Sequence, residues 1–200
     1  MSKWLCLASA LVLSACSDAP NPEPKAPEKV SAPLTGRQAF QMTYPAARTW
    51  AADCEPIRIR SFNLEKPPSE DGKAGAWEVT YVSQSKGRAR IYTWSAIELG
   101  ESLHKGVFGS QDEPWSGPSG QEKPFSTAAI KTDTPEALKT AIAKSAEYLN
   151  KPGKKPQVSF MLENTPRYPD PTWRVFWGST VSAAEWSVFV DATVGTYVGH

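Results

Sequence analysis

Trp173-Arg174-Val175-Phe176-Trp177 predicts a β-strand whose first, third and fifth side chains face one buried layer, because successive side chains of a strand point to opposite faces. The same pattern occurs 96 residues earlier, in Trp77-Glu78-Val79-Thr80-Tyr81. A further row at every second position, Trp186, Val188 and Val190, predicts another strand. These stretches indicate that antiparallel strands form the framework of the chain.

An internal repeat extends outward from these strands. Ser61-Phe62-Asn63-Leu64-Glu65 matches Ser159-Phe160-Met161-Leu162-Glu163 at a shift of 98, and a two-residue loop deletion reconciles this shift with the shift of 96. Each half predicts the order helix, strand, strand, strand. We therefore expect an α+β fold of two αβββ repeats, 37–99 and 133–200, each a helix packed on an antiparallel sheet. Residues 100–132 would form a connecting loop, and the halves could share one sheet or form two.

Helix signals precede the strands of both halves. Thr134-Pro135-Glu136 predicts a start with Thr134 as the N-cap, and Pro152-Gly153 predicts the end. In the first half Thr35 is the expected N-cap, and Pro45 indicates that the helix is kinked or begins there.

One irregularity is expected in the first strand of the first half. Ile57 and Ile59 are out of phase with Phe62 and Leu64. A β-bulge near residues 60–61 would restore one buried face.

The second half resembles the PepSY domain over residues 134–199. The resemblance rests on the αβββ order, the Trp-x-Val of Trp173 and Val175, and the closing Val190-Asp191-Ala192-x-x-Gly195. The first half departs from it, since Ser95-Ala96 replaces Asp-Ala and no glycine follows at the same spacing. The resemblance implies a location outside the cytoplasm and a binding or inhibitory role.

The first residues resemble a lipoprotein leader. Lys3 precedes a predominantly apolar region of ten residues, 4–13, which is too short to span a bilayer. Leu13, Ser14, Ala15 and Cys16 then resemble the lipobox, in which the cysteine thiol takes the lipid. We predict a signal peptide over 1–15, with a diacylglycerol and an N-acyl chain on Cys16 as the membrane anchor.

The segment after the predicted anchor is rich in proline. Residues 16–36 include five prolines among alternating Glu and Lys, which predicts an extended tether. Ser17 favours transfer to the outer membrane, although Asp18 lies close to the position that retains lipoproteins in the inner membrane. We expect the protein to lie at the periplasmic face of the outer membrane, with the inner membrane as the less favoured location.

Catalytic, metal and nucleotide signatures are not recognisable in the sequence. The net charge is +1, and no segment clusters Lys or Arg, so we expect no nucleic-acid binding. His104 and His200 show no ligand spacing, and we expect no metal and no cofactor apart from the covalent lipid. Cys54 is interpreted as a small buried helix residue. Glu65 and Glu163 occupy equivalent repeat positions, so a carboxylate pair is the alternative to two solvated strand ends.

Two aromatic residues in the predicted 100–132 loop are candidates for an interaction surface, Phe108 and Trp115, because long loops are often functional. We expect a non-enzymatic, lipid-anchored protein that binds another envelope protein, plausibly a peptidase or an assembly factor. The alternatives are an enzyme acting on envelope polymers and a carrier of a small ligand or lipid in a cavity between sheet and helix.

Overall fold

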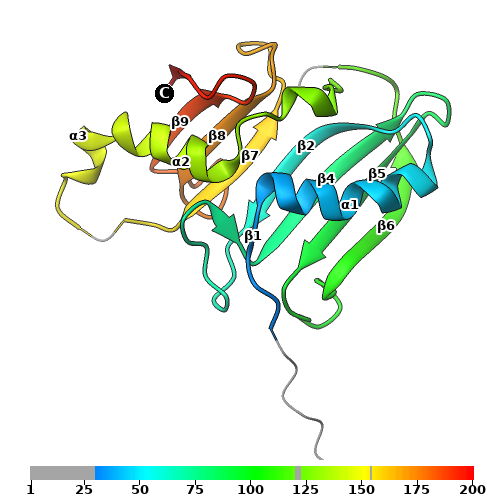
Figure 1. The fold of residues 1–200 in the computed structure, drawn as a ribbon, viewed down its shortest axis with the longest axis horizontal. Coiled ribbons are helices and arrows are strands. Elements are labelled where there is room, and N and C mark those ends of the chain that lie inside the picture. The colour runs from blue at the N-terminus through cyan, green and yellow to red at the C-terminus, as the bar shows by residue number, and fades with distance from the viewer. Residues whose placement is uncertain (1–29, 120–122, 154) are drawn as a thin grey trace, which may run out of the picture.

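A single eight-stranded antiparallel sheet forms the framework of the protein, in the strand order β10-β9-β8-β7-β2-β4-β5-β6. The computed structural model describes residues 30–119, 123–153 and 155–200. Helices α1 and α2 both pass over one face of the sheet (Figure 1), which confirms the α+β class. The elements are β1 (Leu34–Thr35), α1 (Gly36–Trp50), β2 (Glu55–Phe62), β3 (Lys73–Ala74), β4 (Ala76–Ser83), β5 (Arg88–Ser95), β6 (Gly106–Pro114), the 3-10 helix η1 (Thr127–Ala129), α2 (Thr134–Ala143), α3 (Ala146–Leu149), β7 (Val158–Glu163), β8 (Thr172–Trp177), β9 (Trp186–Asp191) and β10 (Tyr197–Gly199).

The first and second halves of the chain meet at the centre of this sheet. Strands β2 and β7 pair antiparallel, with Arg58 opposite Glu163 and Arg60 opposite Met161. Strands β4, β5 and β6 continue the sheet beyond β2, and β8, β9 and β10 continue it beyond β7. The two halves therefore share one sheet, a question that the sequence left open.

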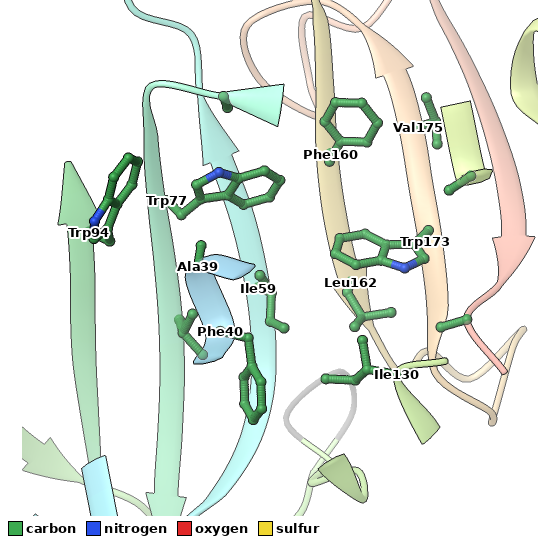
Figure 2. Packing of buried hydrophobic residues seen from close by; sticks show 14 of the residues in the cluster. Ala39, Phe40, Ile59, Trp77, Trp94, Ile130, Phe160, Leu162, Trp173 and Val175 are labelled. Atoms are coloured by element: carbon green, nitrogen blue, oxygen red, sulfur yellow. The ribbon is translucent and has the colours of Figure 1, made fainter. Parts of the chain in front are cut away.

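One continuous hydrophobic core lies between the sheet and the helices and includes residues from both halves. Figure 2 shows Trp77 and Phe160 facing each other near the β2–β7 junction, where their ring centroids are 6.2 Å apart. Trp77 and Trp173 are both fully buried. Burial of side chains of this size stabilises the fold by roughly 2–3 kcal/mol each, which makes the shared core the main link between the halves.

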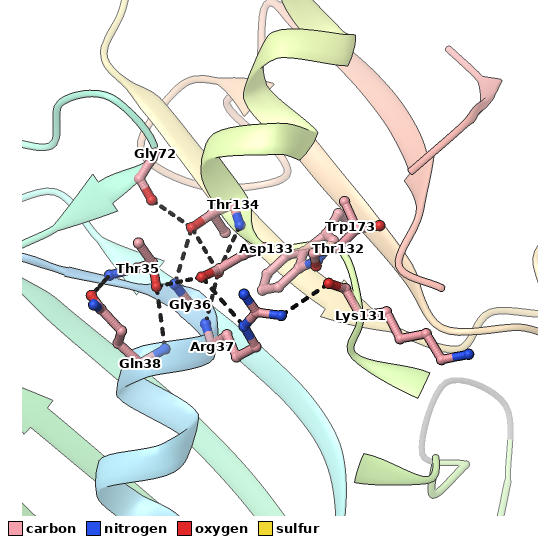
Figure 3. Close-up of polar contacts among 10 residues, drawn as sticks. All are labelled: Thr35, Gly36, Arg37, Gln38, Gly72, Lys131, Thr132, Asp133, Thr134 and Trp173. Atoms are coloured by element: carbon pink, nitrogen blue, oxygen red, sulfur yellow. Dashed lines mark hydrogen bonds and ion pairs between the residues drawn. The ribbon is translucent and has the colours of Figure 1, made fainter. Parts of the chain in front are cut away.

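The N-termini of α1 and α2 meet and are capped together (Figure 3). Thr35 is the N-cap of α1, as predicted, and forms a capping box with Gln38. The N-cap of α2 is Asp133, not the predicted Thr134, and its carboxylate accepts a hydrogen bond of 2.8 Å from the Thr134 N–H. The same carboxylate accepts from the Thr35 hydroxyl at 2.6 Å and from the Arg37 N–H at 2.9 Å. Asp133 therefore joins the starts of both helices.

Two buried tryptophans hold the segments that lead into the helices. The Trp77 Nε1–H donates to the Leu34 carbonyl, and the Trp173 Nε1–H donates to the Thr132 carbonyl, both at 2.9 Å. A Cβ on Gly36 would lie 2.6 Å from the Trp173 ring. The start of α1 therefore requires glycine, because the ring of the other half fills the space where a side chain would lie.

The structure excludes one of the two alternatives predicted for the first helix and corrects the predicted length of the second. Pro45 lies inside α1, which begins at Gly36, so the proline does not start the helix. In the second half α2 ends at Ala143, and α3 is a separate short helix. The Ser145 hydroxyl donates to the Ala141 carbonyl at 2.7 Å, and this side-chain bond competes with the backbone bond that would continue the helix.

Regular structure also occurs in the ranges predicted as tether and loop. Strand β1 lies at the end of the predicted 16–36 tether and pairs with β3. Strand β6 lies within the predicted 100–132 loop and pairs with β5. Within the described ranges, no helix has the length and apolar character needed to cross a membrane.

Candidate functional site on the helix-free face of the sheet

The face of the sheet that points away from the helices is the candidate functional site, and we call it the open face. All the helices in the described part of the chain pack on the opposite face (Figure 1). On β4, for example, Trp77, Val79 and Tyr81 belong to the helix-side core. Glu78 and Thr80 between them line a groove on the open face. The alternation of strand residues therefore gives the sheet one apolar face and one mixed face.

A β-bulge shapes the open face at the start of β2. The register between β2 and β4 shifts between Pro56 and Arg58, so the bulge lies at Ile57 and not near residues 60–61 as predicted. Ile57 packs with Val82 and Trp115 in a second, smaller buried cluster on the open face. The bulge explains why Ile57 is out of phase with the strand, since a bulge places two consecutive residues opposite one.

The polar groove lies beside this cluster and has a volume of about 370 Å³. It is lined by residues of strands β2, β4, β5 and β6 and by Trp115. Trp115 follows the last residue of β6 and is held there by its backbone N–H, which donates to the Gly87 carbonyl at 3.0 Å. The groove is lined by Ile57, Arg58, Arg60, Glu78, Thr80, Ala89, Ile91, Ser110, Gln111, Glu113, Pro114 and Trp115.

Paired charges run across the centre of the open face. The Arg58 Nε lies 3.1 Å from the Glu163 Oε2, and Glu163 is only 6% exposed. Arg60 makes a two-point contact with Glu78, with both nitrogen–oxygen distances 2.9 Å. On β8, burial lowers the pKa of Arg174 while the Glu163 carboxylate acts in the opposite direction. Each guanidinium has an acidic neighbour, so this region does not select anions by charge alone.

The apolar groove lies on the other side of Arg60 and has a volume of about 450 Å³. The Arg60 guanidinium lies over the Phe62 ring, 4.7 Å from its centroid, and Arg60 lines both grooves. The two grooves therefore meet at this side chain. The lining consists of Arg60, Ser61, Phe62, Met161, Phe176, Ser179, Thr180, Val181 and Ser182.

Two side chains that pack away from the helices carry a buried polar atom without a hydrogen-bond partner. Among the described residues these atoms are the Trp115 Nε1, the Asn164 Oδ1 and the Tyr168 hydroxyl. Trp115 packs in the open-face cluster, and the Tyr168 ring packs on Phe189 with the centroids 4.9 Å apart. Unpaired buried donors are rare in folded proteins, because each costs about 1–3 kcal/mol. The indole Nε1–H of Trp115 is therefore a donor for which the described part of the chain supplies no acceptor.

The two aromatic residues predicted as an interaction surface lie at different places. Phe108 is 47% exposed on β6 and pairs with Thr93. Trp115 is only 7% exposed, because it packs on the sheet and does not project from a loop as predicted. Trp115 is seven positions beyond Phe108 along or just after one strand, so the two side chains lie roughly 20 Å apart and form no joint patch.

The carboxylates of Glu65 and Glu163 are not brought together. Glu163 ends β7 opposite Arg58, whereas Glu65 lies beyond Phe62 at the other end of β2 and is exposed. Antiparallel pairing of β2 with β7 places equivalent repeat positions at opposite ends of the pair. A catalytic carboxylate pair therefore has no geometric support here.

Cys54, His104 and His200 each pack against neighbouring residues of the fold. Cys54 is 4% exposed, which confirms its expected burial, and burial raises the pKa of its thiol. It lies in the turn after α1, not within the helix. His104 contacts the Glu98 carboxylate at 2.7 Å, and the His200 ring stacks on Trp186. In the described ranges, no three His, Cys, Asp or Glu side chains gather in a way that could hold a metal ion.

Sequence reasoning missed the arginines and acids of the open face. The alternation of Arg58 and Arg60 with Ile59 could have indicated that both arginines share one face of a strand. Which acids they meet depends on strand order, which the sequence did not provide. The predicted lipidation residues Leu13, Ser14, Ala15 and Cys16 lie outside the described residues.

Comparison with known proteins gives one structural neighbour. No protein-family model matches the sequence, and no curated protein matches it. The crystal structure of a candidate lipoprotein from Clostridium difficile 630 superposes with a TM-score of 0.52 at 11% sequence identity, covering 80% of this chain and 90% of that one. At this identity the likeness concerns the fold, and it shows that the arrangement of strands and helices occurs in another solved structure.

Proposed function

We propose that this protein is a non-enzymatic, lipid-anchored envelope protein that binds another periplasmic protein through the open face. The observation that carries the proposal is the pair of grooves that meet at Arg60, with the buried indole Nε1–H of Trp115, which lacks an acceptor, beside the polar groove. A sheet with one face packed on helices needs no such grooves for stability. Grooves with a few fixed polar groups are the usual form of a recognition surface.

The lipid anchor is supported by two observations. The Leu13-Ser14-Ala15-Cys16 stretch has the order of a lipobox, and the structural neighbour is itself described as a candidate lipoprotein. We propose a diacylglycerol and an N-acyl chain on Cys16 that hold the domain at the periplasmic face of the outer membrane. The Ser17 position supports the outer membrane over the inner membrane.

The PepSY-like interpretation as two repeats is supported by equivalent contacts in the two halves. Trp77 and Trp173 make the same indole bond to the segment before a helix, at Leu34 and Thr132 respectively. These partners are shifted by 96 and 98 residues, the shifts of the sequence repeat. We propose that the halves are degenerate copies of one αβββ unit, and that this unit serves for binding.

The grooves define the chemistry of the partner. The apolar groove, with Phe62, Met161 and Phe176 in its walls, suits one or two large apolar side chains. The polar groove offers the indole Nε1–H of Trp115 as a donor and the carboxylate of the exposed Glu113 as an acceptor. An extended segment with an apolar residue and, beside it, a carbonyl and a basic residue would satisfy both. A peptidase or an assembly factor with an exposed segment of this kind is the proposed partner.

A position-specific crosslinking experiment in cells tests the proposal. A photo-reactive amino acid replaces Val181, which is 37% exposed in the apolar groove, in the lipidated chain. The matched control carries it at Val194, which is 65% exposed in the β9–β10 turn. We expect one envelope protein to be captured from position 181, much less from position 194, and less when Cys16→Ser removes the anchor. Equal capture from both positions would contradict the use of the open face.

The second candidate function is carriage of a small ligand or lipid. The volume and the lining of the apolar groove favour it. The expected cavity between sheet and helices is instead filled by the hydrophobic core. Native mass spectrometry of the purified protein distinguishes the two. A bound lipid that is lost in Phe176→Lys would support carriage, whereas a ligand-free protein that still captures its partner would support protein binding.

A further inference from the structure

The segment that connects β7 to β8, residues 164–171, contacts the open face of the second half, and we call it the strap. The Tyr168 ring packs on Phe189 of β9, with the ring centroids 4.9 Å apart. Phe189 lies between Val188 and Val190, which belong to the helix-side core, so its own side chain lies on the open face. With one of its own aromatic side chains, the strap therefore covers part of the surface proposed for binding.

Few contacts attach the strap to the sheet. The Thr165 N–H donates to the Tyr168 carbonyl at 2.8 Å, and the Tyr168 N–H donates to the Thr165 hydroxyl at 3.0 Å, so both bonds stay inside the strap. The Asn164 amide, at the start of the strap, reaches the Pro124 carbonyl only at 3.5 Å. In the described part of the chain, no hydrogen bond or ion pair joins residues 165–169 to an element outside the strap. The contact of the Tyr168 ring with the sheet is therefore the main attachment.

The closed position of the strap leaves polar atoms unsatisfied. The Asn164 Oδ1 and the Tyr168 hydroxyl are buried and have no hydrogen-bond partner among the described residues. Water would supply these bonds if the strap left the sheet, so burial of the two groups opposes closure. The Tyr168 hydroxyl also lies against Gly199 of β10, where a Cβ would collide with it. Segments with so few attachments belong to the parts of a fold that open locally.

Opening of the strap would lengthen the apolar groove. Phe176 forms part of the wall of that groove. The Arg174 guanidinium lies 5.8 Å from the centroid of the Phe176 ring and 5.4 Å from the centroid of the Phe189 ring, so it joins the groove to the ring that Tyr168 covers. Once Tyr168 leaves, the two phenylalanines and the arginine form one row along the open face.

We propose that the strap opens by release of the Tyr168 ring, and that an aromatic side chain of the partner then takes its place on Phe189. Tyr168 is thus an internal competitor of the partner. An aromatic ring is the group that fits, because the Phe189 ring already holds one at stacking distance and has the Arg174 guanidinium beside it. The replacement by a partner rests on the binding function proposed above, whereas the opening of the strap does not.

Trypsin cleavage after Arg167 in the purified full-length chain measures the opening. A protease cleaves a closed segment only after it has left the sheet, so the rate follows the open fraction, and Gly199→Ala should be cleaved at least about tenfold faster than the parent. This variant displaces the Tyr168 hydroxyl without changing the cleaved sequence. Tyr168→Ser removes the ring and should also be cleaved faster. Tyr168→Phe keeps the ring and loses only the unpaired hydroxyl, so it should be cleaved no faster than the parent.

Matched controls separate opening of the strap from unfolding. Val198→Ala changes the neighbouring residue of β10, which is 38% exposed, and should leave the rate unchanged. The bond after Arg174, within β8, should stay intact in every variant while the sheet is folded. Synthetic strap peptides correct for the effect of Tyr168→Ser on the intrinsic rate. If neither Gly199→Ala nor Tyr168→Ser accelerates cleavage after Arg167, the proposal is overturned.

Photo-crosslinking from position 181 tests the competition with the partner. Gly199→Ala should increase capture of the envelope protein several-fold, because more of the chain has Phe189 uncovered, and Val198→Ala should not. Unchanged capture in a chain whose strap is open would overturn the role of Phe189 in binding. Faster cleavage of Gly199→Ala in a chain that captures no protein would instead support the strap and contradict the proposed binding function.

Discussion

Replacing Asp133 tests the idea that one carboxylate joins the two helices. Asp133 is 6% exposed, and the shortest hydrogen bonds that its carboxylate accepts come from the Thr134 N–H, the Arg37 N–H and the Thr35 hydroxyl. Loss of the N-cap bond costs about 1 kcal/mol. The other two bonds to a charged acceptor contribute about 1.5 kcal/mol each. Asp133→Ala should therefore lower the free energy of unfolding by about 4 kcal/mol.

Urea unfolding followed by tryptophan fluorescence measures this loss. A 4 kcal/mol loss corresponds to a decrease of roughly 10 °C in Tm for a domain of this size. Asp133→Asn keeps one acceptor oxygen and a side chain suited to the N-cap, so we expect it to cost only about 1.5 kcal/mol. The exposed Asp170, changed to Ala, is the control and should alter stability by less than about 0.5 kcal/mol. If Asp133→Ala costs no more than Asp170→Ala, the shared cap does not stabilise the junction.

Three further predictions concern the open face, the helix start and acid stability. Trp115→Phe removes the unpaired indole Nε1–H but keeps most of the ring packing, so it should leave the urea midpoint unchanged or raise it. Trp115→Ala also removes the ring and should lower the free energy of unfolding by about 3–5 kcal/mol. A large loss of stability in both variants would show that the indole Nε1–H has a partner. Gly36→Ala gains up to about 1 kcal/mol in helix propensity but places a Cβ 2.6 Å from the Trp173 ring. We therefore expect a net loss of about 1–2 kcal/mol in the free energy of unfolding. A rise in Tm would refute the close contact. The Ser85 N–H holds the pKa of Asp53 at about 2, so its contribution to stability is present above about pH 4 and is lost as the pH falls towards 2. In Asp53→Asn the urea midpoint should therefore fall less steeply over this range, and an unchanged slope would contradict the assignment.

The sequence by itself determined the local elements of this protein. The alternation of Trp173, Val175 and Trp177 predicts a strand with one buried side, and all three residues are buried in the structure. Thr35 was predicted as an N-cap, and its partner in the capping box, Gln38, is only three residues away, so no distant contact is needed for the cap. Such features depend on neighbours within a few positions, and the sequence contains them directly.

Tertiary structure alone decided how these elements meet. The carboxylate of Asp133, the N-cap of α2, also accepts a hydrogen bond from the Thr35 hydroxyl, 98 residues away in the sequence, a contact that only the folded chain brings about. Trp115 appeared to belong to a loop surface, but a nine-residue β6 directs it onto the sheet, where it is buried. Periodicity shows which side of a strand is apolar but not which strand pairs with which, because pairing depends on contacts between distant segments. The β2–β7 pairing, and with it the open face and its grooves, follows from those contacts.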